Sequence, residues 1–174
     1  GYAVPFCCLW LTRAPWGQII VYRELYAAGI PTQQQALQIK YASVGENYFT
    51  SVGDPSMWAS TREGQRFKSA AQLYAEGGVI LTKASNDRVI GWQRMHDLLD
   101  FSEEQAPSLV ITKDCPNLIR TLPMLVKDPN KPEDVESDSE DHAPDSCRYG
   151  IMAAHWLDSA RRPKARQVAM GGRR

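Results

Sequence analysis

The chain has 174 residues, a hydrophobic content of 43% and a formal net charge of zero. This length and composition fit one compact domain whose hydrophobic core is large enough without disulfide or metal cross-links. A chain with no net charge is not expected to bind nucleic acid over its whole surface. No apolar run approaches the roughly 20 residues that span a bilayer, and the N-terminus lacks the basic and apolar regions of a secretory signal, so we expect no membrane partner.

The four cysteines, at positions 7, 8, 115 and 147, are neither spaced as paired metal ligands nor dense enough for a disulfide framework. Cys7 and Cys8 are adjacent, so they would point to opposite faces of a strand. This cysteine usage predicts a reducing, intracellular setting.

The first third of the chain predicts a β-hairpin, a helix and a further strand. Residues 2–11 are an apolar run of strand length, and residues 18–26 are rich in β-branched and aromatic side chains. The Pro and Gly residues between these runs predict the turn of an antiparallel hairpin. A helix is expected over about residues 33–43, covering the sheet, and a strand over residues 47–53.

Strand and helix patterns then alternate along the chain. The pattern predicts a loop at 57–61, helices at 69–76, 88–99 and 116–122, and strands at 79–82 and 109–112. Alternation of this kind after an N-terminal hairpin predicts an α/β fold, with a mixed sheet flanked by helices.

Charge is unevenly distributed along this neutral chain. Residues 128–145 hold eight acidic residues against Lys131 alone, and residues 159–174 hold six basic residues and no acid. The acidic residues are Asp128, Glu133, Asp134, Glu136, Asp138, Glu140, Asp141 and Asp145, and the basic ones are Arg161, Arg162, Lys164, Arg166, Arg173 and Arg174. A solvated loop and a disordered tail are one interpretation, and tail contacts with DNA phosphates are another. We predict a domain over residues 1–158 and a flexible basic tail over 159–174.

The end of the acidic stretch combines residues suited to metal binding. A helix is expected to begin after Asp141, which is a good N-cap. His142 and Asp145 would then share one face, with Arg148 and Tyr149 one turn beyond. Asp141 is expected to be a cap before it is a ligand, and Arg148 is expected to pair with Asp145 and orient it.

A hard cation such as Mg²⁺ or Mn²⁺ needs oxygen ligands from more than one place in the chain. Asp54 is the candidate partner, because it stands where a predicted strand ends and Pro55 turns the chain away. The alternative for any single Asp in such a place is a turn former or helix cap. Glu24 is a secondary candidate, although a strand Glu more often faces solvent or pairs with a cation.

The segment over residues 141–150, Asp-His-Ala-Pro-Asp-Ser-Cys-Arg-Tyr-Gly, resembles the DHxxDxxRY segment of the nuclease domain of tailed-phage terminase large subunits. Residues 21–26, 53–58, 86–92 and 115–120 resemble further stretches of that family in the same order. The resemblance covers most of residues 1–157. It implies an RNase H-like fold and a metal-dependent endonuclease that cuts concatemeric double-stranded viral DNA.

The resemblance also implies roles for single residues. Asp54 and Asp145 would be catalytic acids and His142 a neighbouring ligand, with Asp141 and Glu24 as secondary candidates, around two Mg²⁺ or Mn²⁺ ions. The candidate DNA contacts are these basic residues: Arg88, Arg161, Arg162, Lys164 and Arg166. The favoured alternative for Arg88 is a structural turn and helix start. The family's first acid lies just ahead of the glycine that Gly1 matches, so we expect this stretch alone to bind metal poorly and to cut slowly or not at all.

The partners implied are the terminase ATPase domain, the portal and the small terminase subunit, in the host cytoplasm during virion assembly, or in a bacterial cytoplasm if prophage-encoded. The chain contains no phosphate-binding Gly-x-x-x-x-Gly-Lys-Ser/Thr motif of its own. The alternative function is a non-catalytic docking module of the packaging motor that binds portal or DNA. A resolvase or transposase of the same broad fold matches the motif less well.

Overall fold

The computed structural model describes residues 5–63, 66–103, 106–136 and 139–161. Side chains are described within these ranges except at 60–67 and from residue 155 onward. The predicted tail therefore lies almost wholly outside the described residues. No helix in the described part of the chain is long and apolar enough to span a bilayer.

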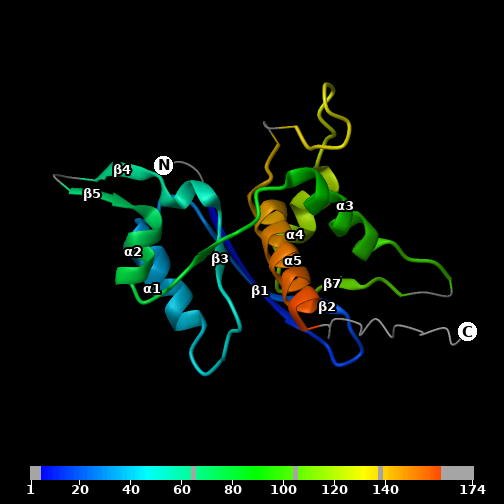
Figure 1. Cartoon of the computed structure of the whole chain (residues 1–174), viewed down its shortest axis with the longest axis horizontal. Helices are drawn as coiled ribbons and strands as arrows, with labels where there is room; N and C mark the ends of the chain where they lie inside the picture. The colour runs from blue at the N-terminus through cyan, green and yellow to red at the C-terminus, as the bar shows by residue number, and fades with distance from the viewer. Residues whose placement is uncertain (1–4, 64–65, 104–105, 137–138, 162–174) are drawn as a thin grey trace, which may run out of the picture.

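A mixed sheet of three strands forms the centre of the molecule (Figure 1). Strand β1 (Phe6–Arg13) pairs antiparallel with β2 (Ile19–Ala27), which confirms the predicted N-terminal hairpin. On its other side β2 pairs parallel with β7 (Leu109–Ile111). This combination of antiparallel and parallel pairing confirms the predicted mixed sheet.

Alternation along β1 divides its side chains between two hydrophobic clusters. Cys7, Leu9 and Leu11 pack against one cluster, whereas Cys8 and Trp10 belong to the other. Successive side chains of a strand point to opposite faces, so the hairpin carries a core on each side. Cys7 and Cys8 thus face opposite ways, as predicted, and all four cysteines are free thiols.

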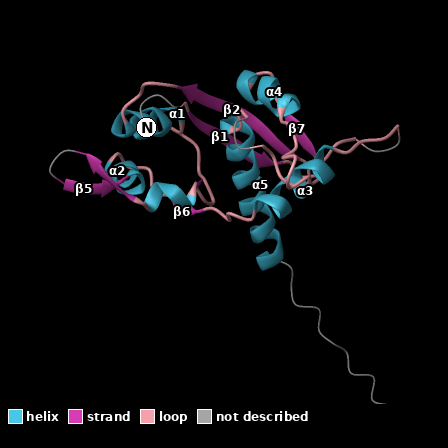
Figure 2. Cartoon of the chain, turned by 90° about the horizontal axis from the view of Figure 1, so that it is seen from above, coloured by secondary structure: helices cyan, strands magenta, loops and turns pink. Residues whose placement is uncertain are grey.

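Helices cover both faces of the sheet, as Figure 2 shows from above. The smaller cluster packs with α1 (Thr32–Ala42) and α2 (Ala70–Glu76), and the larger with α3 (Arg88–Leu99), α4 (Pro116–Thr121) and α5 (His142–Arg161). Local sequence explains several of these helices. Ser69 and Gln72 form a capping box that starts α2, and Asp87 caps α3.

The segment between α1 and α3 is where the sequence-based expectations were wrong. The expected strand at 47–53 is reduced to β3 (Val52–Gly53), and the expected loop at 57–61 contains η1 (Pro55–Trp58) and the start of β4 (Ser60–Glu63). Strand β4 pairs antiparallel with β5 (Arg66–Ser69).

The expected buried strand at 79–82 is likewise reduced to β6 (Thr82–Lys83), which pairs parallel with β3. Val79 is buried beside α2 and donates its backbone N–H to the carbonyl of Tyr74, whereas Ile80 is 79% exposed. The apolar run therefore completes the C-terminal end of α2 before any strand begins. A short apolar run does not by itself distinguish these two outcomes. The last short helix also ends sooner than expected, at Thr121, and continues as η2 (Leu122–Met124).

Two glycines allow α5 to lie deep in the larger cluster. A Cβ at Gly91 of α3 would come within 2.6 Å of Arg148 Cγ, and a Cβ at Gly150 would come within 2.9 Å of a Leu11 methyl carbon in β1. Such approaches are too short for any real side chain, so glycine is needed at both positions. Helix α5 consequently contacts β1 and α3 at close range.

Candidate metal-binding and catalytic site

Helix α5 begins at His142, directly after Asp141, and its first three turns are anchored in the core. Ala143, Cys147 and Ile151 repeat every fourth residue and are essentially fully buried. Pro144 in the first turn fits where no intrahelical donor is required. The buried stripe determines how the helix is rotated, and thereby the direction in which its first-turn acids face.

Three carboxylates gather around one guanidinium at this end of α5. Arg88 Nε donates to Asp134 Oδ1 at 2.9 Å, and Arg88 Nη1 lies 3.4 Å from Asp145 Oδ2 and 3.8 Å from Asp141 Oδ2. Each of the three carboxylate side chains is less than a fifth exposed. We call Asp134, Asp141 and Asp145 the acid cluster. The predicted DNA contact Arg88 therefore has its guanidinium directed at carboxylates.

Electrostatics within the acid cluster are unbalanced. Burial, together with the neighbouring charge of Asp145, raises the pKa of Asp141. The pKa of Asp134 lies below its ordinary value. Partial burial alone would raise this pKa, but the hydrogen bonds from the Val135 backbone and Arg88 outweigh that effect. Arg88 thus stabilises Asp134 well, while Asp141 and Asp145 repel each other across one helical turn.

A second arginine reaches the acid cluster from inside the core. Arg148 is 0% exposed and donates from Nε to Asp145 Oδ1 at 3.0 Å. Its guanidinium carbon lies 4.3 Å from the ring centre of Tyr149 and 5.3 Å from that of Trp92. Its two terminal nitrogens find no hydrogen-bond acceptor among the described residues. The predicted pairing of Arg148 with Asp145 is confirmed.

Asp54 reaches α5 from a distant part of the sequence. It follows β3 and caps η1, where its Oδ1 accepts the Ser56 backbone N–H at 2.6 Å. The hydroxyl of Tyr149 donates to its Oδ2, also at 2.6 Å. Burial raises the pKa of Asp54, but these hydrogen bonds outweigh burial and the pKa is lowered. Tyr149 lies one turn after Asp145 and directly after Arg148, so the two predicted catalytic acids are bound by consecutive residues of α5.

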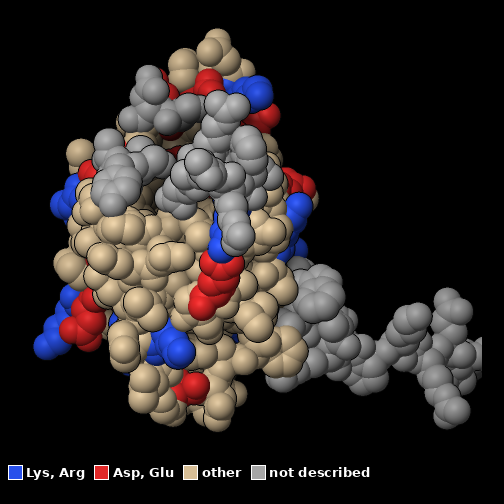
Figure 3. Space-filling view, turned by 90° about the vertical axis from the view of Figure 1, so that its left-hand side faces the viewer, with Lys and Arg blue, Asp and Glu red and all other residues tan. Residues whose placement is uncertain are grey.

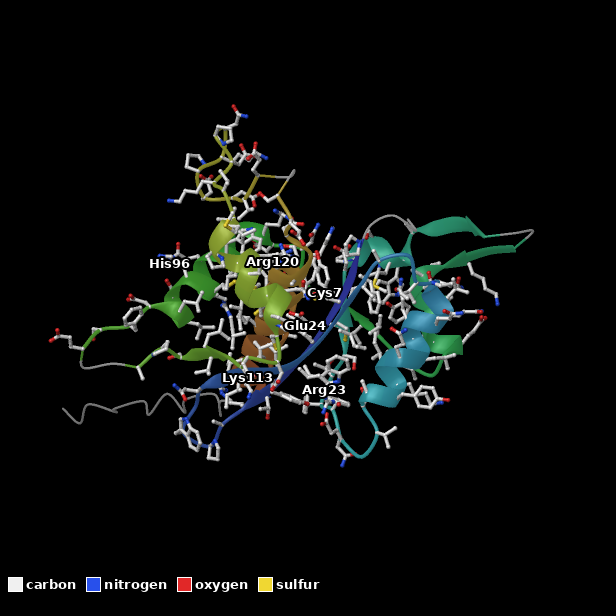
Figure 4. All side chains as sticks on the ribbon, turned by 180° about the vertical axis from the view of Figure 1, so that it is seen from behind. Cys7, Arg23, Glu24, His96, Lys113 and Arg120 are labelled. Carbon is white, nitrogen blue, oxygen red and sulfur yellow. The ribbon has the colours of Figure 1, made fainter. Side chains whose placement is uncertain are left out.

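The remaining predicted ligands lie at different distances from this centre. His142 Nδ1 is 3.9 Å from Asp141 Oδ1. Glu24 instead caps α4, accepting the backbone N–H groups of Asn117 and Leu118, and Figure 4 shows it beside that helix. Within the described residues, no group of three or more His, Cys, Asp and Glu side chains is arranged to hold a metal ion.

Four of the predicted DNA contacts lie outside the described side chains. The α5 backbone ends at Arg161, whose side chain is not among them, and the same holds for Arg162, Lys164 and Arg166. Two site residues were missed from the sequence. Asp134 was counted only as part of an acidic run, and Tyr149 was given no role, although its spacing of four from Asp145 indicates that the two share a helix face.

Comparison with known proteins gives matches among solved structures. No protein-family model and no curated protein matches the chain. The nuclease domain of the P22 large terminase superposes with a TM-score of 0.68 at 16% identity, over 93% of this chain and 82% of that one. The chain has the fold of the terminase nuclease domains. This confirms the predicted RNase H-like class.

Two further matches show the same fold in other bacteriophages. The SPP1 nuclease domain, crystallised with bound Mn, has a TM-score of 0.59 at 20% identity and is matched over 88% of this chain and 81% of its own. The large terminase of a thermophilic bacteriophage has a TM-score of 0.67 at 17% identity. The match covers 87% of this chain and 36% of the thermophilic phage protein, so this chain corresponds to about a third of that protein.

Proposed function

We propose that this chain is the nuclease domain of a viral DNA-packaging terminase and hydrolyses double-stranded DNA with bound Mg²⁺ or Mn²⁺. The observation that carries the proposal is the meeting of Asp54 with the Asp145 turn of α5, through Tyr149, inside the terminase nuclease fold. The bound Mn of the SPP1 domain supports a divalent cation for this chain as well.

The side chains around α5 suit such a cation. Mg²⁺ and Mn²⁺ prefer oxygen ligands, and carboxylates can use several lone pairs at once. Asp54 accepts hydrogen bonds from Ser56 and from Tyr149, and a carboxylate has about four lone-pair sites, so it keeps acceptor capacity for a cation. Burial, and secondly the neighbouring charge of Asp145, raise the pKa of Asp141, and a bound cation would favour its charged form. Asp54 and Asp145 would hold the cation, with His142 and Asp141 beside them and Glu24 as a more distant candidate.

Such cations activate a water molecule for attack on a phosphodiester and stabilise the charge that develops on its oxygens. The protein's own side chains prepare the site for that chemistry. Arg88 and Arg148 contact Asp145 and partly offset the repulsion between it and Asp141. Because Arg88 Nη1 is 3.4 Å from Asp145, its contact is weak and can yield to a cation or to a DNA phosphate.

Double-stranded DNA is the proposed substrate and partner, and its phosphates would be bound by Arg88 and the basic tail. On the face that carries α1 and α2, Figure 3 shows the described basic and acidic side chains interspersed. Changing Arg162, Lys164 and Arg166 together to Ala should weaken DNA binding at low salt. The slope of log affinity against log salt should fall by roughly three, about one for each phosphate that the protein no longer binds. An unchanged slope would remove the tail from the DNA-binding surface.

Cleavage of supercoiled plasmid tests the proposal. With Mn²⁺ or Mg²⁺ the chain should convert the plasmid to nicked and then linear forms, and chelation should stop it. Asp54→Asn and Asp145→Asn should each lose cleavage, whereas Glu46→Gln, just beyond the end of α1, should retain it. Restoring an Asp ahead of Gly1 should raise cleavage, and a folded, DNA-binding protein with that Asp which still cuts no form of DNA at any concentration of either metal would refute the nuclease proposal.

A non-catalytic docking module is the second candidate, and one observation favours it. Asp145 already contacts two arginines, as expected of a carboxylate with a structural role. In that case the chain would bind the portal, the small terminase subunit or DNA beside the ATPase domain without cutting. Portal capture that is unaffected by Asp145→Asn, with no cleavage by the wild type, would favour this function.

A further inference from the structure

The carboxylate of Asp54 accepts hydrogen bonds from two residues of different origin. Ser56 belongs to the same short turn, so its backbone N–H and side chain follow wherever the turn goes. Tyr149 belongs to α5 and is only 7% exposed, so its hydroxyl fixes Asp54 relative to the helix that carries Asp145. The Ser56 backbone and the Tyr149 hydroxyl donate to different oxygens, which restricts the orientation of the carboxylate plane.

Asp145 is held by Arg148, the residue that precedes Tyr149 in α5. The Arg148 side chain is enclosed by the Trp92 and Tyr149 rings and by the space that Gly91 leaves, and Nε is its hydrogen-bonded nitrogen. Its terminal nitrogens are buried without an acceptor in the described part of the chain. Apolar side chains in place of the whole Arg148–Asp145 pair would stabilise a helix interface at lower desolvation cost. The arrangement is therefore better explained by what it does to Asp145.

We propose that Arg148 and Tyr149 are a positioning pair that holds Asp145 and Asp54 in the relative orientation needed to share cation binding. The inference rests on the proposed function in one respect, that these two aspartates bind the cation. Neither member of the pair contacts the cation or DNA. Arg148 acts through the Asp145 carboxylate and Tyr149 through the Asp54 carboxylate. The contact between the Arg148 guanidinium and the Tyr149 ring fixes the orientations of the two carboxylates relative to each other.

Tyr149→Phe is the main test, because it removes the hydroxyl and keeps the ring that packs against Arg148. Mn²⁺ affinity is measured from the electron paramagnetic resonance signal of free Mn²⁺ during a protein titration. We expect binding to weaken by about tenfold or more, the usual cost of losing a group that orients a metal ligand. Tyr22→Phe is the matched control, since its hydroxyl donates to Glu46 at 2.8 Å on the other side of the sheet. It should leave Mn²⁺ affinity unchanged.

A double-mutant cycle separates positioning from general stabilisation. If Tyr149 acts through Asp54, Tyr149→Phe should have no further effect on Mn²⁺ affinity in the Asp54→Asn background. A purely structural tyrosine would weaken binding equally in both backgrounds, which would overturn the inference. Arg148→Lys keeps the charge but loses the Nε geometry, and should also weaken Mn²⁺ binding. Should that variant fail to fold, the Tyr149 cycle alone decides.

Failure of the inference and failure of the proposed function give different results. Mn²⁺ binding that weakens in Tyr149→Phe, in a protein that never cuts DNA even with an Asp restored ahead of Gly1, supports the positioning pair and refutes the nuclease. DNA cleavage with unchanged Mn²⁺ affinity in Tyr149→Phe refutes the positioning pair and supports the nuclease. A wild-type chain that binds no Mn²⁺ refutes the positioning pair, whatever the plasmid assay shows.

Discussion

Two of the clusters in which an arginine meets carboxylate beside aromatic rings, among the described residues, lie on opposite sides of the sheet. On the α1 side, Arg23 donates to Glu46 Oε1 at 2.7 Å, and the hydroxyls of Tyr22 and Tyr48 also donate to Glu46. We call these four residues the Arg23 cluster. Its single carboxylate matches its single cation, and Arg23 with both tyrosines lowers the pKa of Glu46 to about 2.

The acid cluster on the α5 side has the opposite balance. Three carboxylates meet Arg88 there, and Arg148 is committed to Asp145 from within the core. Burial and the Asp145 charge raise the pKa of Asp141, whereas the pKa of Glu46 is lowered. The same residue types thus form a satisfied ion pair on one side of the sheet and an unsatisfied one on the other. Unsatisfied carboxylates at a helix start are what a cation site requires.

Removing the buried arginine should give the largest difference between the two sides. Arg148→Met should lower the free energy of unfolding by about 3–5 kcal/mol, because it removes one partner of a buried ion pair. Arg23→Met breaks a pair whose side chains are about a third exposed, so its effect should be much smaller. Urea unfolding of both variants measures this. If both variants lost the same free energy of unfolding, the Arg148–Asp145 pair would contribute no more to stability than the more exposed Arg23–Glu46 pair.

Metal binding should stabilise only the protein with an intact α5 side. At Mn²⁺ a hundredfold above its dissociation constant, the free energy of unfolding should rise by about 2.7 kcal/mol in the wild type. Glu46→Gln should show the same gain, and Asp145→Asn should show almost none. Thermal unfolding with and without Mn²⁺ checks this. Stabilisation that persists in Asp145→Asn would place the cation elsewhere.

Arg88 should have opposite effects with and without metal. Arg88→Gln removes a partly exposed ion pair, so the metal-free protein should lose about 1 kcal/mol of unfolding free energy. The same change removes a positive charge that competes for Asp145, so Mn²⁺ should bind more tightly. Calorimetric titration of wild type and variant measures the second effect. Weaker Mn²⁺ binding in Arg88→Gln would show that Arg88 supports the site directly.

Much of the secondary structure around the two clusters could be predicted from local sequence. The hairpin and the helix over Arg88–Leu99 have strong periodic or β-branched patterns, and α5 has its N-cap position and buried stripe. These features depend on neighbouring residues only. The pairing of Asp145 with Arg148 is also local, since the two are three positions apart.

The rest depends on contacts between distant residues. Asp134 and Arg88 are 46 positions apart, and Tyr149 and Asp54 are 95 apart. No periodicity encodes such pairs. Glu24 illustrates the same limit, because its role at α4 depends on an element 93 positions away. The neighbouring Arg23 lies on the other side of the strand, as Figure 4 shows, so one dipeptide serves both faces of the sheet.

The smallest expected effect is the acid dependence of the Arg23 cluster. The pKa of Glu46 in the folded protein is about 2, below its ordinary 4.5, so its ion pair contributes stability above pH 4.5. That contribution is lost as the pH falls from 4.5 towards 2. Glu46→Gln should therefore show a shallower loss of unfolding free energy across this window, measured by urea unfolding at several pH values.

A residual slope is expected in Glu46→Gln, because Arg120 and Tyr26 lower the pKa of Glu140 to about 2 as well. Adding Glu140→Gln should flatten the profile further. If the single variant loses stability between pH 4.5 and 2 as steeply as the wild type, Glu46 does not bind fewer protons when folded than when unfolded. The Arg23 cluster would then not be a satisfied ion pair, and its electrostatic difference from the acid cluster would be lost.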